Sequence, residues 1–274
     1  MKPQTGSLPD APGRDAARLG RRDVVVALVC GALLLVGWEA VCRAGFVSRL
    51  VLPAPSAIAV ELWSAVREIV VGGPMRTHAL TTIYEILAGF GLGVGLGFVL
   101  GVLISEIPAA RRVAMPWLIA LNAAPKIALA PLLLVWFGFG IGSKIVMAAL
   151  IAFFPLLINV VSGLSQVEEA KLKLMRSLAA SRTMTLAKVK LPDAMPAIFA
   201  GLKTAIVLAV VGAVVGEFVG AESGLGYVIK QSEFQLDVAQ TFAVIVLLSI
   251  IGIAFFYAIE FIERRALFWT RPHP

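Results

Sequence analysis

The stretch TTIYEILAGFGLGVGLGFVLGVLI, residues 81–104, carries one charged side chain, Glu85, in 24 residues. A helix needs about 20 apolar residues to cross the ~30 Å hydrocarbon core of a bilayer. The apolar residues run continuously and do not alternate with polar ones, which excludes a strand of a membrane β-barrel. This stretch therefore predicts a transmembrane helix.

The whole chain has the same apolar character. Of its 274 residues, 59% are hydrophobic and 15% are charged, whereas soluble domains have about 45–50% and ~25%. A soluble globule of this composition would expose large apolar patches and aggregate. The sequence therefore predicts an all-α polytopic membrane protein.

Six membrane spans are expected within a transmembrane domain that covers residues 24–274. The spans lie near residues 24–41, 81–104, 114–137, 144–163, 194–219 and 239–262. Residues 1–23 are polar, rich in Pro, Gly and Arg, and lack an apolar period, so a disordered cytoplasmic tail is expected. A signal peptide is the alternative for the first span, but no small-residue cleavage site follows it.

Proline residues mark breaks between and within the spans. Pro125 and Pro131 interrupt the third span, and the fifth is entered through Pro192 and Pro196. Between the first two spans, Pro53, Pro55 and Ser56 predict a break followed by a helix N-cap at Ser56. The apolar residues after this break recur at helical spacing: Ile58, Leu62, Ala65, Val66, Ile69 and Val70. They predict an amphipathic helix on the outer face or against the bundle.

The basic residues predict the orientation of the chain. With the N-terminus inside, sixteen of the 24 Lys and Arg residues fall in cytoplasmic segments. Six fall in outer segments, namely Arg43, Arg49, Arg67, Arg76, Lys144 and Lys230. This bias follows the positive-inside rule, so both termini are expected in the cytoplasm. The net charge of +7 is therefore attributed to membrane topology, and no nucleic-acid partner is expected.

Four glycines of the second span share one helical face: Gly89, Gly93, Gly97 and Gly101. Small residues every four positions allow two membrane helices to approach closely, so this face predicts helix packing. A phosphate-binding glycine loop needs a strand–turn–helix setting, which an apolar membrane span does not provide.

Polar and ionisable residues within the spans are the candidates for a translocation pathway. A charge inside a bilayer is costly and usually faces a partner or a water-filled cavity. Lys126 follows Pro125 in the broken third span, one turn after Asn122, and both are predicted to line the pathway. The alternative is that Lys126 binds an acidic group or freed carbonyls and holds the broken helix. Glu217 is predicted to act as an external gate, and Glu85 fits the interface and the pathway equally well.

The one long cytoplasmic loop, residues 164–193, reads LSQVEEAKLKLMRSLAASRTMTLAKVKLPD and holds six basic residues. An apolar stripe at helical spacing consists of Val167, Ala170, Leu174 and Leu178. Small residues, Ala179-Ala180-Ser181, indicate a turn, and a second short helix from Thr183 to Lys190 is expected to break at Leu191-Pro192. A solvated amphipathic loop is the simpler interpretation, and a docking element for a partner subunit is the other.

The spacing of this loop is similar to that of a known motif. Ala179-Ala180-Ser181, followed ten residues later by Leu191-Pro192 and then by Pro196 and Gly201, resembles the EAA loop of ATP-binding-cassette importer permeases. Further blocks resemble the nitrate/taurine/sulfonate branch: residues 52–56, 124–132, 136–138, 216–218, 224–227 and 263–265. The chain departs from the family pattern in having Ala179 for the loop glycine, Lys173 for an acidic residue, and Glu85 for an arginine.

The resemblance implies a type I ABC importer permease fold in the bacterial cytoplasmic (inner) membrane. It implies a homodimer, cytoplasmic ATPase subunits that carry ATP and magnesium, and a periplasmic or lipid-anchored substrate-binding protein. The substrate is then a small anion such as nitrate, a sulfonate or taurine. The residues expected to contact the ATPase are Arg176, Ser177, Leu178, Ala179, Ala180, Ser181, Arg182, Thr183 and Met184.

No catalytic residue, metal or cofactor is expected on this chain. It has no phosphate loop ending in Lys-Ser/Thr, which ATP hydrolysis would require, and His78 and His273 lie outside the spans. The alternative function is a secondary transporter driven by an ion gradient. That class predicts inverted repeats and ionisable residues at mid-membrane, and the sequence shows no clear repeat.

Overall fold

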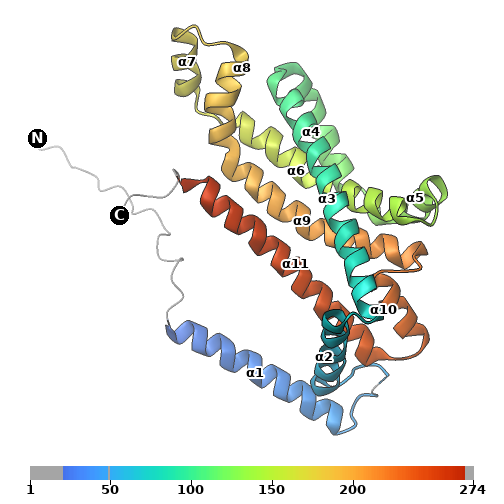
Figure 1. Ribbon diagram of the computed structural model, residues 1–274. Helices are drawn as coiled ribbons and strands as arrows, with labels where there is room; N and C mark the ends of the chain where they lie inside the picture. Colours follow the sequence, from blue (N-terminus) through green and yellow to red (C-terminus); the bar gives the residue numbers. More distant parts are fainter. Residues whose placement is uncertain (1–20, 49, 269–274) are drawn as a thin grey trace, which may run out of the picture. The chain divides into compact units, whose positions relative to one another are not determined.

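The structure is a computed structural model that describes residues 21–48 and 50–268. All regular elements in these residues are helices (Figure 1). The chain divides into two units, residues 1–57 and 58–274, which we describe separately. The predicted tail falls mainly on residues 1–20, which lie outside the described residues. Residues 21–23 already belong to the first helix, so that helix begins three residues earlier than predicted.

The first unit consists of α1 (Arg21–Arg43) and the start of α2 (Pro55–Val71). The Glu39 carboxylate accepts hydrogen bonds from Arg43 Nε at 2.6 Å and from the backbone N and Oγ of Ser56 at 3.0 and 2.7 Å. Ser56 was predicted to be the N-cap, but α2 already begins at Pro55. A proline fits the first helical position because its missing N–H needs no partner there. Glu39 then satisfies the next N–H.

The second unit contains the remaining helices. They are α3 (Pro74–Glu106), α4 (Pro108–Ala123), η1 (Lys126–Leu129), α5 (Ala130–Phe137), α6 (Ile141–Ser165), α7 (Glu169–Ser177), α8 (Arg182–Thr185), η2 (Leu186–Lys190), α9 (Leu191–Gly220), α10 (Leu225–Phe234) and α11 (Val238–Ala266). Its core lies where α3, α6 and α9 meet. Small residues at four-residue spacing, among them Ala148 and Ala152 of α6 and Ala205 and Ala209 of α9, are fully buried there. Small side chains let these helices pack at close range.

The glycine face of α3 lies against α6. A Cβ atom added to Gly93 would lie 2.5 Å from the carbonyl oxygen of Ala149, and one added to Gly97 would lie 3.0 Å from that of Phe153. Gly89 and Gly101 also approach α6, whereas Gly91 and Gly95 have open space around them. The predicted packing face is therefore a direct contact between two helix backbones.

Among the described residues, five helices are long and apolar enough to span a membrane, and a bent pair makes a sixth. The bent pair is the predicted third span, in which α4 and the η1–α5 segment meet at 77°. Ala124 leaves the helix with ψ near 143°, because the ring of Pro125 excludes the helical conformation for the residue before it. The third span is therefore a broken element and not a kinked helix.

The predicted helix break at Leu191-Pro192 is wrong, because the helix continues from Arg182 through to Gly220. The five residues before α9 form a π-helical turn, η2, in which hydrogen bonds skip one extra residue. A proline ring normally clashes with the carbonyl four residues earlier, and the wider turn relieves this crowding. Ser181 caps the start of α8 by accepting a hydrogen bond from Met184 N at 3.2 Å.

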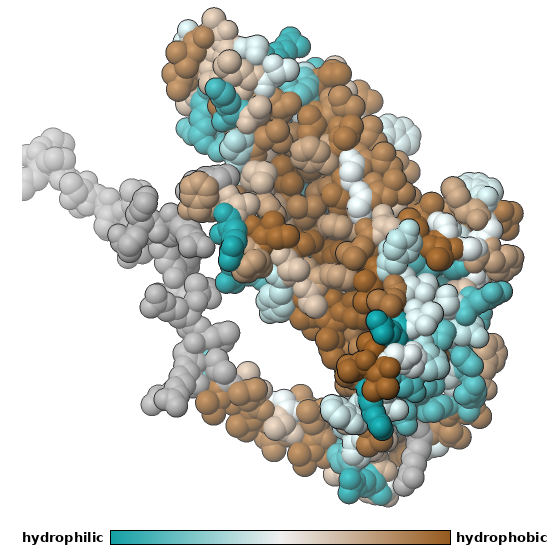
Figure 2. Space-filling view, in the orientation of Figure 1, coloured by the Kyte–Doolittle hydropathy of each residue, from teal (hydrophilic) through white to brown (hydrophobic). Residues whose placement is uncertain are grey.

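The surface of the second unit has an apolar zone between two polar ends. In Figure 2 the brown surface lies between teal residues at α7 and α8 and teal residues around α10. This distribution is the one expected of helices whose middle portions contact lipid or other apolar helices.

Candidate functional site

Helices α7, α8 and η2 form a two-helix hairpin at one end of the bundle, which we call the elbow (residues 169–190). The nine residues predicted to contact a partner form its tip, and eight of them are exposed while Ala180 is half-buried. The tip shows three large apolar side chains to solvent: Leu178 is 67% exposed, Leu174 of the adjoining turn 59%, and Met184 45%. Apolar side chains gathered on a protruding polar element are typical of a contact surface.

Two ion pairs anchor the elbow to the bundle. Lys171 Nζ of α7 lies 2.6 Å from Asp193 of α9, and Lys190 Nζ of η2 lies 2.7 Å from Glu106 of α3. The hydrogen bond from Lys171 to Asp193 raises the pKa of this lysine. These contacts fix the base of the elbow and leave its tip uncovered.

The turn at the tip is strained at Ala179. Its φ is +49°, in the left-handed region that favours glycine. A residue with a Cβ atom pays roughly 1 kcal/mol or more in this conformation.

We expect Ala179→Gly to stabilise the elbow, because glycine adopts the left-handed conformation without a Cβ clash. Limited proteolysis of the detergent-solubilised protein at the elbow should slow in this variant. Ala187→Gly, within the helical stretch of η2, is the matched control and should have the opposite effect, because glycine weakens a helix by up to ~1 kcal/mol. Faster cleavage of Ala179→Gly than of the parent would contradict the strain assignment.

The helix break between α4 and α5 brings the predicted pathway residues Asn122 and Lys126 together. Lys126 Nζ donates to the Asn122 carbonyl at 2.5 Å and to its Oδ1 at 3.2 Å, and lies 4.7 Å from the centre of the Phe154 ring. Lys126 therefore binds a freed carbonyl, as the structural alternative expected. Asn122 is exposed and Lys126 half-exposed, so both polar groups are also accessible at the surface of a membrane segment.

A buried charge cluster lies at the opposite end of α9 from the elbow. Glu85 of α3, Lys144 of α6 and Glu217 of α9 are each at most 2% exposed. The Glu85 carboxyl group lies beside that of Glu217, and both interact with the charge of Lys144. Lys144 Nζ also donates to the carbonyls of Gly140 at 3.0 Å and Gly220 at 2.7 Å.

Lys144 was expected in an outer segment, and its place in this cluster was not predicted from the sequence. The available signal was Glu85, the one charged residue of a span that holds no Lys or Arg. Glu217 was predicted to line the pathway as an external gate; its side chain is fully buried in this structure, and the pathway role stays a prediction.

The cluster also holds the N-terminus of α10. Gly226 N donates to Glu217 Oε2, and Leu225 N donates to Thr82 Oγ1 at 2.7 Å. Thr82 Oγ1 in turn donates to Glu217 Oε1 at 2.6 Å. Gly224, with φ +115°, places the turn so close to Glu217 that no side chain would fit there. Glu217 thus connects α3, α9 and α10.

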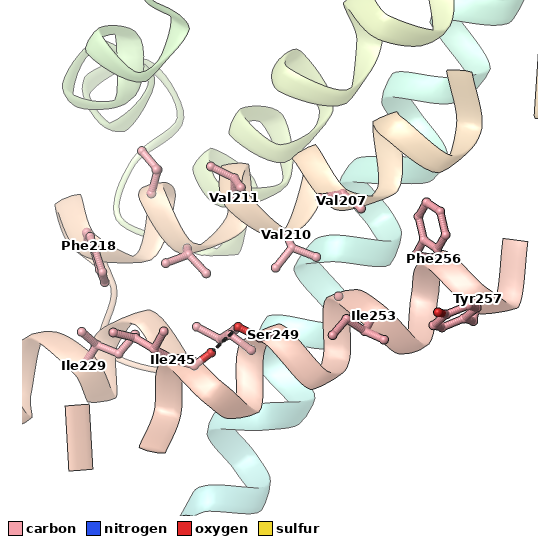
Figure 3. A pocket seen from close by; sticks show the side chains of 14 residues that line it. Val207, Val210, Val211, Phe218, Ile229, Ile245, Ser249, Ile253, Phe256 and Tyr257 are labelled. Carbon is pink, nitrogen blue, oxygen red and sulfur yellow. Dashed lines mark hydrogen bonds between the residues drawn. The ribbon is translucent and has the colours of Figure 1, made fainter. Parts of the chain in front are cut away.

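An apolar pocket of about 690 Å³ lies between α9 and α11 (Figure 3). Ser249 and Tyr257 are the polar side chains that line it, and Ser249 donates its hydroxyl to the Ile245 carbonyl of its own helix at 2.9 Å. Specific small-molecule sites need several convergent polar groups to orient a ligand. The pocket is therefore suited to packing against apolar groups, and not to recognising a polar substrate.

Comparisons with known proteins give a consistent result. A family described as binding-protein-dependent transport system inner membrane component matches residues 93–267. A protein of Haemophilus influenzae named as an ABC transporter permease is 34% identical over 243 residues, 89% of this chain and 96% of the relative. SsuC of Bacillus subtilis, named as an aliphatic sulfonates transport permease, is 32% identical over 246 residues, 90% of this chain and 88% of the relative.

A solved structure shares the fold. An inward-facing structure of the MetNI methionine ABC transporter aligns with a TM-score of 0.61 at 22% identity, covering 68% of this chain and 93% of the other.

Proposed function

The chain belongs to the family of binding-protein-dependent transport system inner membrane components, and we propose that two copies of it form the substrate pathway of an importer. ATP hydrolysis, with magnesium, takes place on separate subunits that bind the elbow. A periplasmic or lipid-anchored binding protein delivers the substrate at the other end. Both termini and the elbow then face the cytoplasm, in agreement with the basic residues of residues 164–193.

The elbow carries this proposal. A permease that lacks its own ATPase must be coupled to ATP hydrolysis on another subunit through a contact outside the membrane. The elbow has two ion pairs to the bundle at its base, and exposed Leu178 and Met184 at its tip. A surface of this kind can transmit a conformational change of the ATPase to the membrane helices.

The alternative of an ion-driven secondary transporter receives no support. It requires ionisable groups at mid-membrane that bind the coupling ion. Glu217 instead binds Thr82 and the turn before α10, and Lys144 binds the backbone carbonyls of Gly140 and Gly220. We propose a small anion of the sulfonate or taurine type as substrate, supported by the name of the SsuC relative and by the accessible Lys126.

Ala180→Arg tests the docking function. Ala180 is half-buried at the elbow tip, so a long charged side chain there should clash in a close-packed contact, where overpacking costs about 1–3 kcal/mol. We expect the ATPase to co-purify poorly and uptake to fall at least tenfold. Ala187→Arg, on η2 outside the nine tip residues, is the control and should leave both near the parent level. Normal ATPase binding and uptake by Ala180→Arg would reject the docking role.

Lys126→Cys tests the pathway. Polar groups exposed in a membrane segment need water or a partner around them, so the cysteine should react with a membrane-impermeant thiol reagent. The rate should change when the ATPase is trapped with nucleotide. Val135→Cys, on exposed apolar α5, should stay unlabelled, and Cys30 and Cys42 are first replaced by alanine. A cysteine at position 126 that stays unlabelled in every state would leave Lys126 with its structural role alone.

A further inference from the structure

The basic residues of the elbow fall into two groups. Lys171, Lys173 and Lys190 each have a carboxylate partner, at 2.6, 3.3 and 2.7 Å. Arg176, Arg182 and Lys188 have no ion-pair partner within the described part of the chain, and all three are exposed. The second group therefore supplies the positive charge of the elbow that has no carboxylate beside it.

Two of these cations face a single groove. The groove has a volume of about 360 Å³ and is lined by Glu106, Leu172, Arg176, Ala180, Arg182, Thr185 and Lys190. It holds three cations and one carboxylate, and that carboxylate is already bound to Lys190. The Arg176 and Arg182 guanidinium groups are therefore the uncompensated charges of the groove.

Arginine side chains in this setting select a particular ligand chemistry. A guanidinium group presents a rigid fork of N–H donors that matches the two oxygens of a carboxylate. The exposed apolar residues of the elbow, Leu174, Leu178 and Met184, favour a partner that also presents an apolar surface. A protein face with apolar floor and acidic rim meets both requirements, whereas a lipid headgroup meets the charge alone.

We propose that the ATPase surface that receives the elbow carries carboxylate side chains, and that at least one of them enters the groove between Arg176 and Arg182. This inference rests on the proposed function, because it assumes that the elbow binds the ATPase. It adds the charge and chemistry of the receiving surface. The contact is therefore electrostatically steered, with its rate of formation falling as ionic strength rises.

Carbodiimide crosslinking tests the proposal directly, because this reagent joins a carboxylate to an amine without a spacer and does not react with guanidinium groups. R176K and R182K are prepared separately and each is purified with its co-purifying ATPase. We expect mass spectrometry to find an amide bond from each substituted position to an Asp or Glu of the ATPase. The native Lys171–Asp193 pair is the internal positive control. If that internal link forms and neither variant is joined to the ATPase, the proposal is wrong.

Charge reversal provides a second measurement. The double variant R176E/R182E should bind the ATPase about tenfold or more weakly, because it places like charges opposite each other. K188E is the control. Lys188 lines a separate groove of about 320 Å³ on the elbow, so this change should weaken binding less than threefold. Equal effects of K188E and R176E/R182E would show a general charge effect and reject the specific groove.

The possible failures can be told apart. If the unmodified chain retains no ATPase, the proposed function itself fails, and this inference with it. If the chain retains ATPase and R176E/R182E binds it as well as the parent does, only the inference fails. The binding is measured in nanodiscs of zwitterionic and of anionic lipid. A loss confined to anionic nanodiscs would assign the groove to lipid headgroups and overturn the proposal.

Discussion

Gly93→Ala is expected to destabilise the protein strongly, although it adds a single methyl group. The new Cβ atom would lie 2.5 Å from the carbonyl oxygen and 3.1 Å from the Cα atom of Ala149. Both are backbone atoms of α6, so no side-chain rotation can relieve the clash and the two helices must separate. Overpacking of this kind costs about 1–3 kcal/mol and sometimes more.

Gly95→Ala is the matched control on the same helix. A Cβ atom at Gly95 has no neighbour within 4 Å, and alanine favours a helix over glycine by up to ~1 kcal/mol. We expect its thermal unfolding in detergent to occur at the same temperature as that of the parent or higher, and that of Gly93→Ala to occur several degrees lower. Equal unfolding temperatures for the two variants would show that α3 and α6 are not in tight contact.

This pair shows how far the sequence could predict the fold. The four-residue period of Gly89, Gly93, Gly97 and Gly101 was visible in the sequence, because a period of about 3.6 residues places them on one helical face. The span positions followed from apolar length. The partner of the glycine face could not be read, because it depends on how α3 and α6 cross in space.

Other features depended on interactions between residues far apart in the chain. The prolines of the third span predicted an interruption, but not the 77° bend between α4 and the η1–α5 segment. Pro192 indicated a break, but the preceding π-helical turn accommodates its ring. At the tip of the elbow, the small residues predicted a turn correctly, whereas its left-handed Ala179 required the backbone.

The buried charge cluster was the largest omission. Thr82 and Glu217 are 135 positions apart in sequence and hydrogen-bonded in the structure. The positive-inside count assigned Lys144 to an outer loop because it stands at the start of an apolar run. Its burial depends on α9, where Gly216 allows a close approach to Lys144 and the Gly220 carbonyl accepts a hydrogen bond from its Nζ.

Glu217, which the sequence predicted to be an external gate, also connects α3, α9 and α10, and we expect its loss to destabilise that end of the bundle. Glu217→Ala would remove the acceptor of Gly226 N and of Thr82 Oγ1, together with the carboxylate that interacts with Lys144. Lys144 is 2% exposed, so its ammonium group cannot turn to water. The buried Gly226 N–H would also lose its acceptor, and a buried donor left unsatisfied costs about 1–3 kcal/mol. We expect a large fall in unfolding temperature in detergent, with protease cleavage appearing first at the turn before α10.

Glu222→Ala is the control for this charge. Glu222 also interacts electrostatically with Lys144, but its side chain is exposed, so water can replace it and the unfolding temperature should be unchanged. Glu217→Gln retains the shape of the side chain and one acceptor oxygen, so its unfolding temperature should lie between those of Glu217→Ala and Glu222→Ala. This variant keeps the test possible if Glu217→Ala does not accumulate. If Glu217→Gln and Glu222→Ala unfold at the parent temperature while uptake is lost in Glu217→Gln alone, Glu217 acts in transport and not in holding α10. If the Glu217 carboxylate instead connects three helices around the buried lysine, the unfolding temperature should decrease in the order Glu222→Ala, Glu217→Gln, Glu217→Ala.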